Sequence, residues 1–308
     1  MNQDYIKLDP WSIIEEGFNI SQVKSSESLF SIGNGAMGQR ANFEEDYTGP
    51  TFQGSYIAGV YYPDKTRVGW WKNGYPEYFA KVLNAPNWIG IHVLINGEVL
   101  DLNKCLRITD FKRELNMKKG WYKRSFIASL SENTHVKVES TRILSLDMDE
   151  LGVINYEITP LNTNAEIEFI PYLDSGITNE DTNWDDKFWD TLQITEENQQ
   201  AFIHSRTMKT DFNVCTYMQS KVFVGEKEVQ LDYSKKETNT YIGFKYSVKV
   251  NKNQKLTIQK YAGYCVSINH NTNNLVNASK KVLDKGFSLG FSQLKQNQKE
   301  AWAHIWEM

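Results

Sequence analysis

Two short segments of the chain combine aromatic side chains with charged groups, the residue types that bind sugars. Aromatic faces stack on the C–H groups of a sugar ring, and neighbouring polar groups bind its hydroxyls. The first segment therefore predicts a carbohydrate contact, although such a cluster is equally typical of a loop that packs against another domain. Within residues 67–78 it contains Arg67, Trp70, Trp71, Lys72, Tyr75 and Tyr78.

The second segment, residues 180–190, places two adjacent acids between two tryptophans. Asp185 and Asp186 could accept hydrogen bonds from sugar hydroxyls, while Trp184 and Trp189 stack on the ring. Adjacent acids near a turn are more often part of a solvated loop whose indoles are buried. We favour this second interpretation and keep Trp184 and Asp185 as candidates.

A nucleotide site has weaker support. Gly33, Gly35 and Gly38 are spaced as G-x-G-x-x-G, but that fingerprint requires a helix to begin on the glycines, so that its N–H groups meet a pyrophosphate. Residues 39–50 contain acids, glycine and proline, which indicate turns and loops. The context therefore favours a glycine-rich strand corner over a nucleotide site.

Metal and nucleophile sites are also not expected. The five histidines lie far apart and lack neighbouring ligands at helical or hairpin spacing. Cys105, Cys215 and Cys265 are widely separated and form no C-x-x-C pair, and no G-x-S-x-G motif is present. We predict three free thiols and no resident metal.

The composition of the 308 residues limits the partners. A net charge of −4 with scattered basic residues argues against nucleic acid, which binds clustered cations. The N-terminal residues are polar, without the charged-then-apolar pattern of a secretory peptide, and no apolar run is long enough to cross a bilayer. We therefore expect a cytoplasmic protein that contacts neither nucleic acid nor membrane.

Most of the chain shows the two-residue alternation of half-buried strands. Asn96-Gly97 is a hairpin signal between two of these runs, and no linker divides the region. The pattern predicts an all-β fold, a large antiparallel β-sandwich over residues 1–270. The expected strands are 28–32, 54–61, 89–94, 99–102, 121–130, 134–144, 152–159, 165–173, 192–194, 200–206, 214–224, 241–250 and 255–266.

The pattern becomes helical in residues 271–308. Apolar residues at helical spacing predict a helix over 274–285 with Gly286 as its C-cap, and a second helix from Ser288. Trp302 and Trp306 share one face of that second helix. Two tryptophans on one face need a large surface to bury them, which indicates the start of a helical linker to a further domain. The alternative is a helix packed back on the sandwich.

Several motifs resemble the N-terminal domain of glycoside hydrolase family 65, the family of maltose, kojibiose and trehalose phosphorylases. Ala41 departs from the pattern, because relatives usually carry a glycine there. Residues 64–76 resemble the maltose phosphorylase branch. The resemblance is carried by ESLFSIGNG at Glu27–Gly35, RANFEE at Arg40–Glu45, QGSYIAGVY at Gln53–Tyr61, NAPNW at Asn84–Trp88, INGE at Ile95–Glu98, RELNM at Arg113–Met117 and RILSL at Arg142–Leu146.

The resemblance implies how the whole enzyme works. Phosphate itself is the nucleophile, and a single general-acid glutamate protonates the departing oxygen. Both that glutamate and the phosphate site belong to an (α/α)6 barrel that follows the helical linker, outside these residues. The parent would convert maltose and phosphate, with inversion, to β-glucose 1-phosphate and glucose. It would use no cofactor, since inorganic phosphate is a substrate, and it would form a homodimer.

We therefore assign no catalytic residue to this chain and expect it to be inactive alone. The resemblance implies that the domain supports the barrel, shapes the rim of its active site and helps form the dimer. We place the candidate rim residues at Trp70, Trp71, Tyr75, Trp88, Trp184 and Asp185, and candidate interdomain contacts at Trp302 and Trp306.

Two alternatives stay open at this point. A sandwich with exposed tryptophans also fits a free-standing carbohydrate-binding module. The parent could instead be a kojibiose or trehalose phosphorylase, or a hydrolase of the same family, since the residues that decide lie mainly in the barrel.

Overall fold

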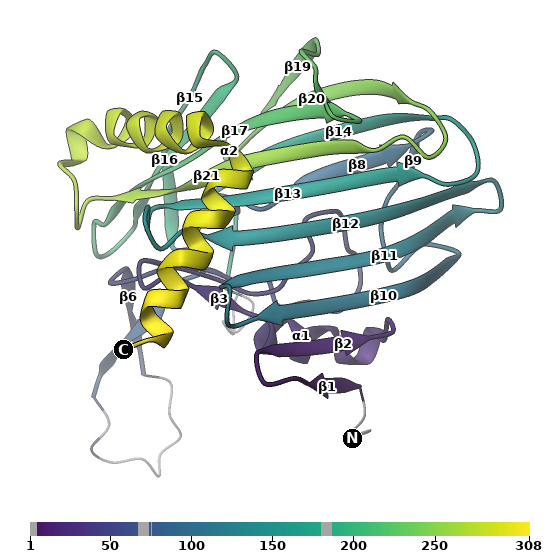
Figure 1. The fold of residues 1–308 in the computed structure, drawn as a ribbon. Coiled ribbons are helices and arrows are strands. Elements are labelled where there is room, and N and C mark those ends of the chain that lie inside the picture. Colours follow the sequence, from purple (N-terminus) through teal and green to yellow (C-terminus); the bar gives the residue numbers. More distant parts are fainter. Residues whose placement is uncertain (1–4, 67–73, 75, 180–186) are drawn as a thin grey trace.

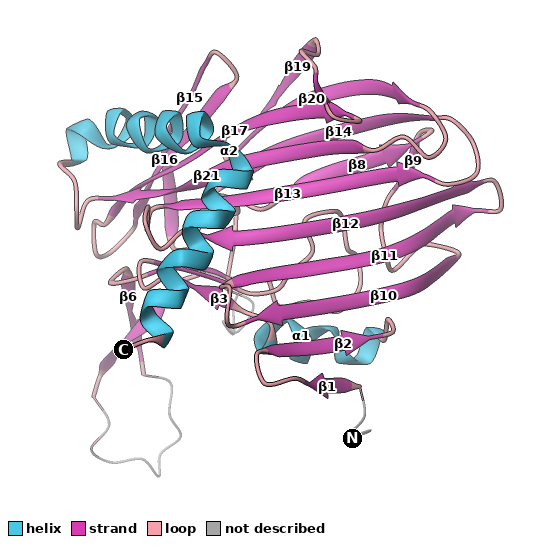
Figure 2. Ribbon diagram, viewed as in Figure 1, coloured by secondary structure: helices cyan, strands magenta, loops and turns pink. Residues whose placement is uncertain are grey.

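The fold is an antiparallel β-sandwich covered on its outer face by a long helix (Figures 1 and 2). The computed structural model describes residues 5–66, 74, 76–179 and 187–308. Within these residues, none of the helices has the length and apolar character required to span a membrane. The predicted all-β sandwich with C-terminal helices is confirmed.

The large sheet contains eleven strands of the described chain, in the order β1-β2-β10-β11-β12-β13-β21-β17-β16-β15, with β18 paired to β17. All its pairings are antiparallel. The strands are β1 (Ile6–Leu8), β2 (Ser12–Glu16), β10 (Arg107–Asn116), β11 (Trp121–Ser131), β12 (Thr134–Leu144), β13 (Leu151–Pro160), β15 (Trp189–Glu197), β16 (Gln200–Thr207), β17 (Asn213–Val224), β18 (Lys227–Glu228) and β21 (Leu256–Val266).

A second sheet packs against the inner face of the first and has the order β19-β20-β14-β8-β9. Alternate residues of its strands point inward, as in the buried positions of β8 and β14, and with the inner face of the large sheet they form the main core. Its strands are β8 (Ile91–Ile95), β9 (Glu98–Val99), β14 (Ala165–Asp174), β19 (Tyr233–Glu237) and β20 (Tyr241–Val250).

Smaller elements close one end of the sandwich (Figure 1). The stretch with three closely spaced glycines forms the β3–β4 hairpin, so the predicted strand corner is confirmed and no helix begins there. The elements are the 3-10 turn η1 (Ile20–Gln22), α1 (Val23–Leu29), β3 (Ile32–Gly33), β4 (Met37–Gln39), β5 (Ser55–Ile57), β6 (Tyr61–Lys65), β7 (Tyr78–Val82) and the 3-10 turn η2 (Thr272–Asn274).

The expected strand over residues 28–32 is wrong. Its first half belongs to α1, whose buried face is formed by Val23, Ser26, Glu27 and the adjoining Phe30. These positions follow the helical spacing i, i+3, i+4 and i+7. The prediction considered only residues 28–32, where the alternation of a strand is present. The helical spacing starts at Val23 and was therefore missed.

Strand β10 was missed because its alternation is interrupted. The pairing of β10 with β11 shifts between Thr109 and Lys112, and Asp110 adopts a left-handed backbone with φ 51°. This bulge places one additional residue in the strand and moves the following side chains to the opposite face. The Asn96-Gly97 turn is confirmed, with φ of 52° and 81°, and it joins β8 to β9.

The C-terminal helix α2 (Leu275–Trp306) is broken at Gly290, where φ is 76° and ψ is 163°. Figure 2 shows its two segments meeting at an angle. The predicted cap at Gly286 is wrong, because this glycine is buried inside the helix. A Cβ added there would lie 2.4 Å from Leu151 Cδ2.

Helix α2 lies on the outer face of the large sheet. Leu275, Ala278, Leu283 and Leu294 form a second core with outward side chains of the sheet, such as Val153. The helix therefore packs back on the sandwich, which was the alternative interpretation. Its second segment crosses the ends of β13, β12 and β11 (Figure 1).

The break in α2 generates a stability prediction. We expect Gly290→Ala to lower the free energy of unfolding by about 1–3 kcal/mol, because φ 76° with ψ 163° is a backbone conformation essentially restricted to glycine. Urea unfolding followed by circular dichroism measures the change. Gly38→Ala is the control, since its added methyl would meet Tyr56 Cβ at an ordinary 3.7 Å. Equal effects of the two variants would contradict the prediction.

Candidate functional site

Two adjacent glutamates and two arginines form a buried ion cluster inside the sandwich. Arg124 of β11 contacts Glu45 Oε1 at 2.5 Å and Glu44 Oε2 at 2.7 Å. Arg142 of β12 donates from Nε to Glu44 Oε1 at 3.1 Å, and Tyr156 donates its hydroxyl to Glu45 at 3.0 Å. All four charged side chains are fully buried. The residues expected in a turn or loop do lie in a loop, and its two glutamates are internal.

The ion cluster also holds the backbone of the preceding loop. Arg142 donates to the carbonyl oxygen of Arg40 at 3.0 Å and to that of Asn42 at 2.7 Å. Buried charges are tolerated only when they are paired and hydrogen-bonded, so this geometry is closely specified. The loop that begins at Arg40 therefore has a fixed position relative to the large sheet.

Buried amides connect this loop to residues 51–55. Asn42 accepts a hydrogen bond from the Gly54 amide at 3.1 Å and donates to the Phe52 carbonyl at 3.0 Å. Gln39 donates to the Gly54 carbonyl at 2.9 Å and accepts from Ser55 Oγ at 2.6 Å. The loop and strand β5 therefore form one hydrogen-bonded unit.

This unit carries a hollow of about 350 Å³ that combines aromatic rings with hydrogen-bonding side chains. Phe52 is exposed, while Tyr56 and Gln53 are half-buried. This is the combination that binds sugars, aromatic faces beside a few placed polar groups. We call it the Arg40 hollow. It is lined by Arg40, Phe52, Gln53, Tyr56, Val82, Asn84 and Asn179.

Gly54 allows the side chains of the hollow to pack closely. A Cβ added at Gly54 would lie 2.4 Å from Arg40 Cδ and 2.5 Å from the Tyr56 hydroxyl oxygen. Arg40 is further held by hydrogen bonds to the carbonyls of Phe52 at 2.8 Å and Lys24 at 3.1 Å. The guanidinium is thus positioned by the fold before any ligand arrives.

The end of strand β7 and the residue that precedes the second predicted segment meet at this hollow. Asn84, just after β7, donates its backbone N–H to Asn179 Oδ1 at 2.7 Å, and Asn179 donates to the Val82 carbonyl at 2.8 Å. The Asn84 carbonyl accepts from the indole of Trp189 at 2.8 Å. Val82 ends strand β7, which begins at Tyr78, and Asn179 directly precedes residues 180–186 in the sequence, so the hollow adjoins the second segment and is linked to the first through β7.

The structure tests only part of the predicted residue set. Trp70, Trp71, Tyr75, Trp184 and Asp185 lie outside the described residues.

Two tryptophans of the predicted segments and motifs are in the core. Trp88 is fully buried, so its prediction as a rim residue is corrected, because neither face of its indole is available to a sugar. Trp189 is also buried, as the alternative interpretation of its segment expected, whereas Tyr78 is 51% exposed.

Trp302 and Trp306 contact their own domain. Their rings stack at 5.7 Å, Trp306 packs on the edge of Trp11 at 5.1 Å, and its indole donates to the Met117 carbonyl at 3.1 Å. With Gly120 and neighbouring residues they line an apolar pocket of about 180 Å³. Trp306 is nevertheless 46% exposed, so part of the aromatic stripe faces solvent.

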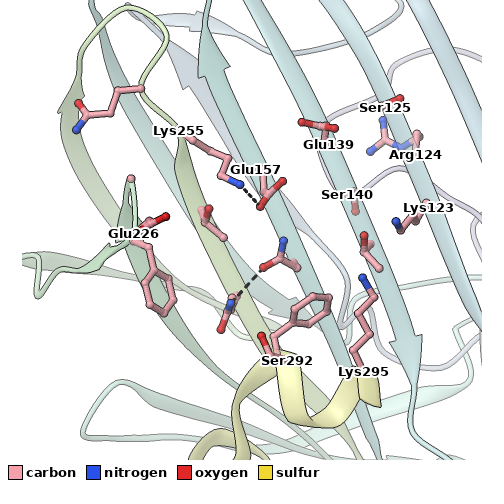
Figure 3. Close-up of a pocket in the computed structure, with 18 of the residues that line it drawn as sticks. Lys123, Arg124, Ser125, Glu139, Ser140, Glu157, Glu226, Lys255, Ser292 and Lys295 are labelled. Carbon is pink, nitrogen blue, oxygen red and sulfur yellow. Dashed lines mark hydrogen bonds and ion pairs between the residues drawn. The ribbon is translucent and has the colours of Figure 1, made fainter. Parts of the chain in front are cut away.

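A broader groove of about 930 Å³ crosses the outer face of the large sheet beside α2 (Figure 3). Glu139 and Glu157 are directly opposite each other on β12 and β13. Glycoside cleavage often uses two carboxylates, but here Lys137 pairs with Glu139 at 2.9 Å and Lys255 with Glu157 at 2.7 Å. These paired charges are typical of a solvated sheet face, so we place the candidate site at the Arg40 hollow.

Sequence reasoning missed Arg40, Phe52 and Tyr56 as site residues. Arg40 and Tyr56 lie in motifs that were used only to identify the resemblance, and Phe52 directly precedes the second of these motifs. A buried hydrogen-bond network, and not a shared helix or strand, brings these residues together. Gly54 was the available signal, since a glycine between polar and aromatic residues often marks a close approach.

Comparisons with known proteins agree with this architecture. The model of the glycosyl hydrolase family 65, N-terminal domain, matches residues 13–305. The maltose phosphorylase of Bacillus subtilis (strain 168) is 37% identical over 306 residues, which cover 99% of this chain and 40% of that protein. The alpha,alpha-trehalose phosphorylase of Thermoanaerobacter brockii is 27% identical over 315 residues, covering 97% of this chain and 40% of that protein.

A solved structure described as a putative kojibiose phosphorylase from the human microbiome has the same fold. Its TM-score is 0.86 at 23% identity, with 98% of this chain and 39% of that chain covered. The chain therefore spans about two fifths of the length of the relatives it matches.

The buried ion cluster generates a stability prediction. We expect Glu44→Gln to lower the free energy of unfolding at neutral pH by about 3–5 kcal/mol, because the variant leaves Arg124 and Arg142 with too little neutralising charge inside the core. The control is Glu157→Gln, which breaks a partly exposed pair and should cost at most about 1 kcal/mol. Urea unfolding of the three proteins measures both effects.

The same variant tests the pH dependence of this cluster. Burial alone would raise the pKa of Glu44, but the charges of Arg142 and Arg124 outweigh it and lower the pKa to about 2 from 4.5. A lowered folded pKa stabilises the protein above the unfolded pKa, and this contribution is lost as the pH falls toward 2. The stability difference between the native protein and Glu44→Gln should shrink over that interval. A constant difference would contradict the assignment.

Proposed function

This chain belongs to glycosyl hydrolase family 65, whose N-terminal domain it matches, and from that membership we propose a non-catalytic role in a disaccharide phosphorylase. The proposed enzyme is of the maltose phosphorylase type and carries its catalytic groups on a barrel beyond this domain. The domain supports that barrel and forms part of the rim of its active site. The contact between this domain and the sugar is the Arg40 hollow.

The observation that carries this proposal is the meeting of three separate features at one place. The loop held by the ion cluster, the end of β7 and the residue before the 180–186 segment all line the Arg40 hollow. In sequence, residues 180–186 follow Asn179 directly, and strand β7 links the hollow to the 67–78 segment. A surface that gathers these groups is suited to contact a substrate held mainly by another domain.

The chemistry of the hollow supports a rim and not a catalytic centre. In phosphorolysis a phosphate oxygen forms a bond to the sugar anomeric carbon while the glycosidic C–O bond breaks, and a carboxylic acid gives its proton to the departing oxygen. Among the described residues, the seven that line the hollow include no carboxylate. The guanidinium of Arg40 donates to two backbone carbonyls, so the fold fixes its orientation.

The partners follow from the same proposal. The apolar pocket lined by Trp302 and Trp306, with Trp11 packed against Trp306, supplies an aromatic surface that the barrel of the same chain could cover. A homodimer and an α-glucoside such as maltose are proposed from the family membership. No cofactor is required, since phosphate is a substrate. We propose a cytoplasmic location, which suits the three free thiols at Cys105, Cys215 and Cys265.

Maltose is proposed over kojibiose or trehalose because the maltose phosphorylase of Bacillus subtilis is 37% identical and the trehalose phosphorylase 27% identical over similar lengths. A family 65 hydrolase is the remaining alternative. The exposed rings of Phe52, Tyr78 and Phe79 also favour a second candidate, a carbohydrate-binding module that acts alone.

The purified chain distinguishes these two roles. With maltose and phosphate it should release no glucose 1-phosphate, and calorimetric titration with millimolar maltose or maltooligosaccharides should show no saturable binding, because the sugar contacts are completed only beside the barrel. Glucose 1-phosphate production would overturn the non-catalytic role. Saturable binding that is lost in Phe52→Ala but retained in Tyr233→Ala would instead support the binding module.

The rim role is tested in an enzyme that carries this domain ahead of a family 65 barrel. Gln53→Ala should raise the KM for the disaccharide by about 2–10-fold with kcat little changed, since it removes one hydrogen bond of about 0.5–1.5 kcal/mol. Gln230→Ala, at an exposed position after β18, is the matched control. An unchanged KM for Gln53→Ala, Phe52→Ala and Tyr56→Ala alike would refute the rim assignment.

A further inference from the structure

Three potential metal ligands of different types converge where the large sheet joins the C-terminal helix. Glu150 precedes β13, Cys265 lies near the end of β21, and His270 lies in the connection that leads through η2 into α2. One ligand atom of each lies within 4.8 Å of the other two. Glu150 is 115 and 120 residues from the other two groups, so only the fold brings them together.

The three groups already contact one another. His270 Nε2 lies 2.7 Å from Glu150 Oε1 and 2.9 Å from Oε2, and Cys265 Sγ lies 3.5 Å from Glu150 Oε2. Cys265 is fully buried, while the side chains of Glu150 and His270 are 13% and 29% exposed. A sulfur, a nitrogen and an oxygen ligand therefore share one small, partly enclosed volume.

We propose that Glu150, Cys265 and His270 form a binding site for a divalent transition metal, with Zn²⁺ as the best match. Zn²⁺ binds thiolate, imidazole and carboxylate at about 2.3, 2.0 and 2.0–2.2 Å, respectively, in a tetrahedral arrangement. All three ligand atoms lie within 4.8 Å of one another, and the His270–Glu150 contact of 2.7 Å would need to open to admit the ion. A fourth position is left for water.

The surroundings favour a preformed site. The backbone carbonyl of Glu150 accepts hydrogen bonds from the Tyr217 hydroxyl at 2.8 Å and from the Tyr264 N–H at 3.1 Å. His270 donates its backbone N–H to the Val266 carbonyl at 3.0 Å. These bonds hold the ligand-bearing segments in place, as supporting contacts do in known metal sites.

A second hollow gives the ion a path to Glu150. It has a volume of about 330 Å³ and is lined by Glu150 together with the glycine-rich β3–β4 turn and residues at the end of β21. The hollow therefore connects solvent to the carboxylate without displacing the sheet. It also provides space for the water that would complete the coordination.

Binding should release a proton from the thiol. The Sγ–H bond breaks as the S–metal bond forms, and the proton passes to solvent, as for any cysteine ligand. Affinity should therefore increase with pH.

A bound ion would link three segments that are otherwise joined by weaker contacts. It would attach the turn before β13 to the end of β21 and to the start of the path into α2. The position of α2 on the sandwich would then depend on the metal. This role is separate from the Arg40 hollow, so either proposal can fail without the other.

Cobalt provides a direct test with the metal-free chain. We expect one Co²⁺ per chain, a thiolate-to-cobalt charge-transfer band and displacement of Co²⁺ by Zn²⁺. Cys265→Ser should abolish the band. His270→Gln, at a partly exposed position where misfolding is a smaller risk, should weaken Zn²⁺ affinity at least about tenfold in a competition titration with a chromophoric chelator.

Two matched controls identify the site. Cys105→Ser removes a different thiol, and His92→Gln removes a histidine that contacts the Asp46 carboxylate at 2.7 Å. Both should bind cobalt as the native chain does. Absence of a charge-transfer band, or a band unchanged by Cys265→Ser and His270→Gln, would overturn the proposal and leave an ordinary ion pair beside a thiol.

Discussion

The buried pairing of Glu44 and Glu45 with Arg124 and Arg142 is the constraint on which much of this domain depends. Removing four charges from water is costly, and the cost is recovered only where each carboxylate meets a guanidinium in good geometry. The loop after β4 cannot move without separating these charges. The cluster therefore determines where Arg40 and Asn42 lie, although it contacts no solvent.

The effect of this constraint extends to the candidate site through a chain of hydrogen bonds. Asn42 and Gln39 transmit the position of the loop to residues 52–55, which place Phe52, Gln53 and Tyr56 around the hollow. Strand β7 and Asn179 complete it from the other side. A domain that holds surface groups so firmly from within is suited to present them to a neighbouring domain.

Sequence reasoning succeeded where one local rule acts alone. The alternation of strands such as β20 and the Asn96-Gly97 turn report directly on burial and backbone geometry, and both were predicted. It failed where contacts between residues far apart in the sequence determine the local structure. The bulge at Asp110 hid β10, and the burial of Gly286 against Leu151 is a packing relation that no local pattern records.

The site was predicted less well than the fold for the same reason. Trp88 has the residue type of a sugar contact, but its position between the sheets makes it a core residue. Glu44 and Glu45 look like a solvated acidic turn until Arg124 and Arg142, about 80 to 98 residues away, are placed beside them. Residue type indicates possible chemistry, and the fold decides whether that chemistry is accessible.

The strand order of the large sheet also has a consequence for biosynthesis. Strand β21, the last in the chain, lies between β13 and β17. While the chain emerges from the ribosome, both neighbours expose an unpaired edge until residues 256–266 are available. Such edges invite intermolecular pairing. The large sheet of this domain therefore closes only after residues 256–266 have been synthesised.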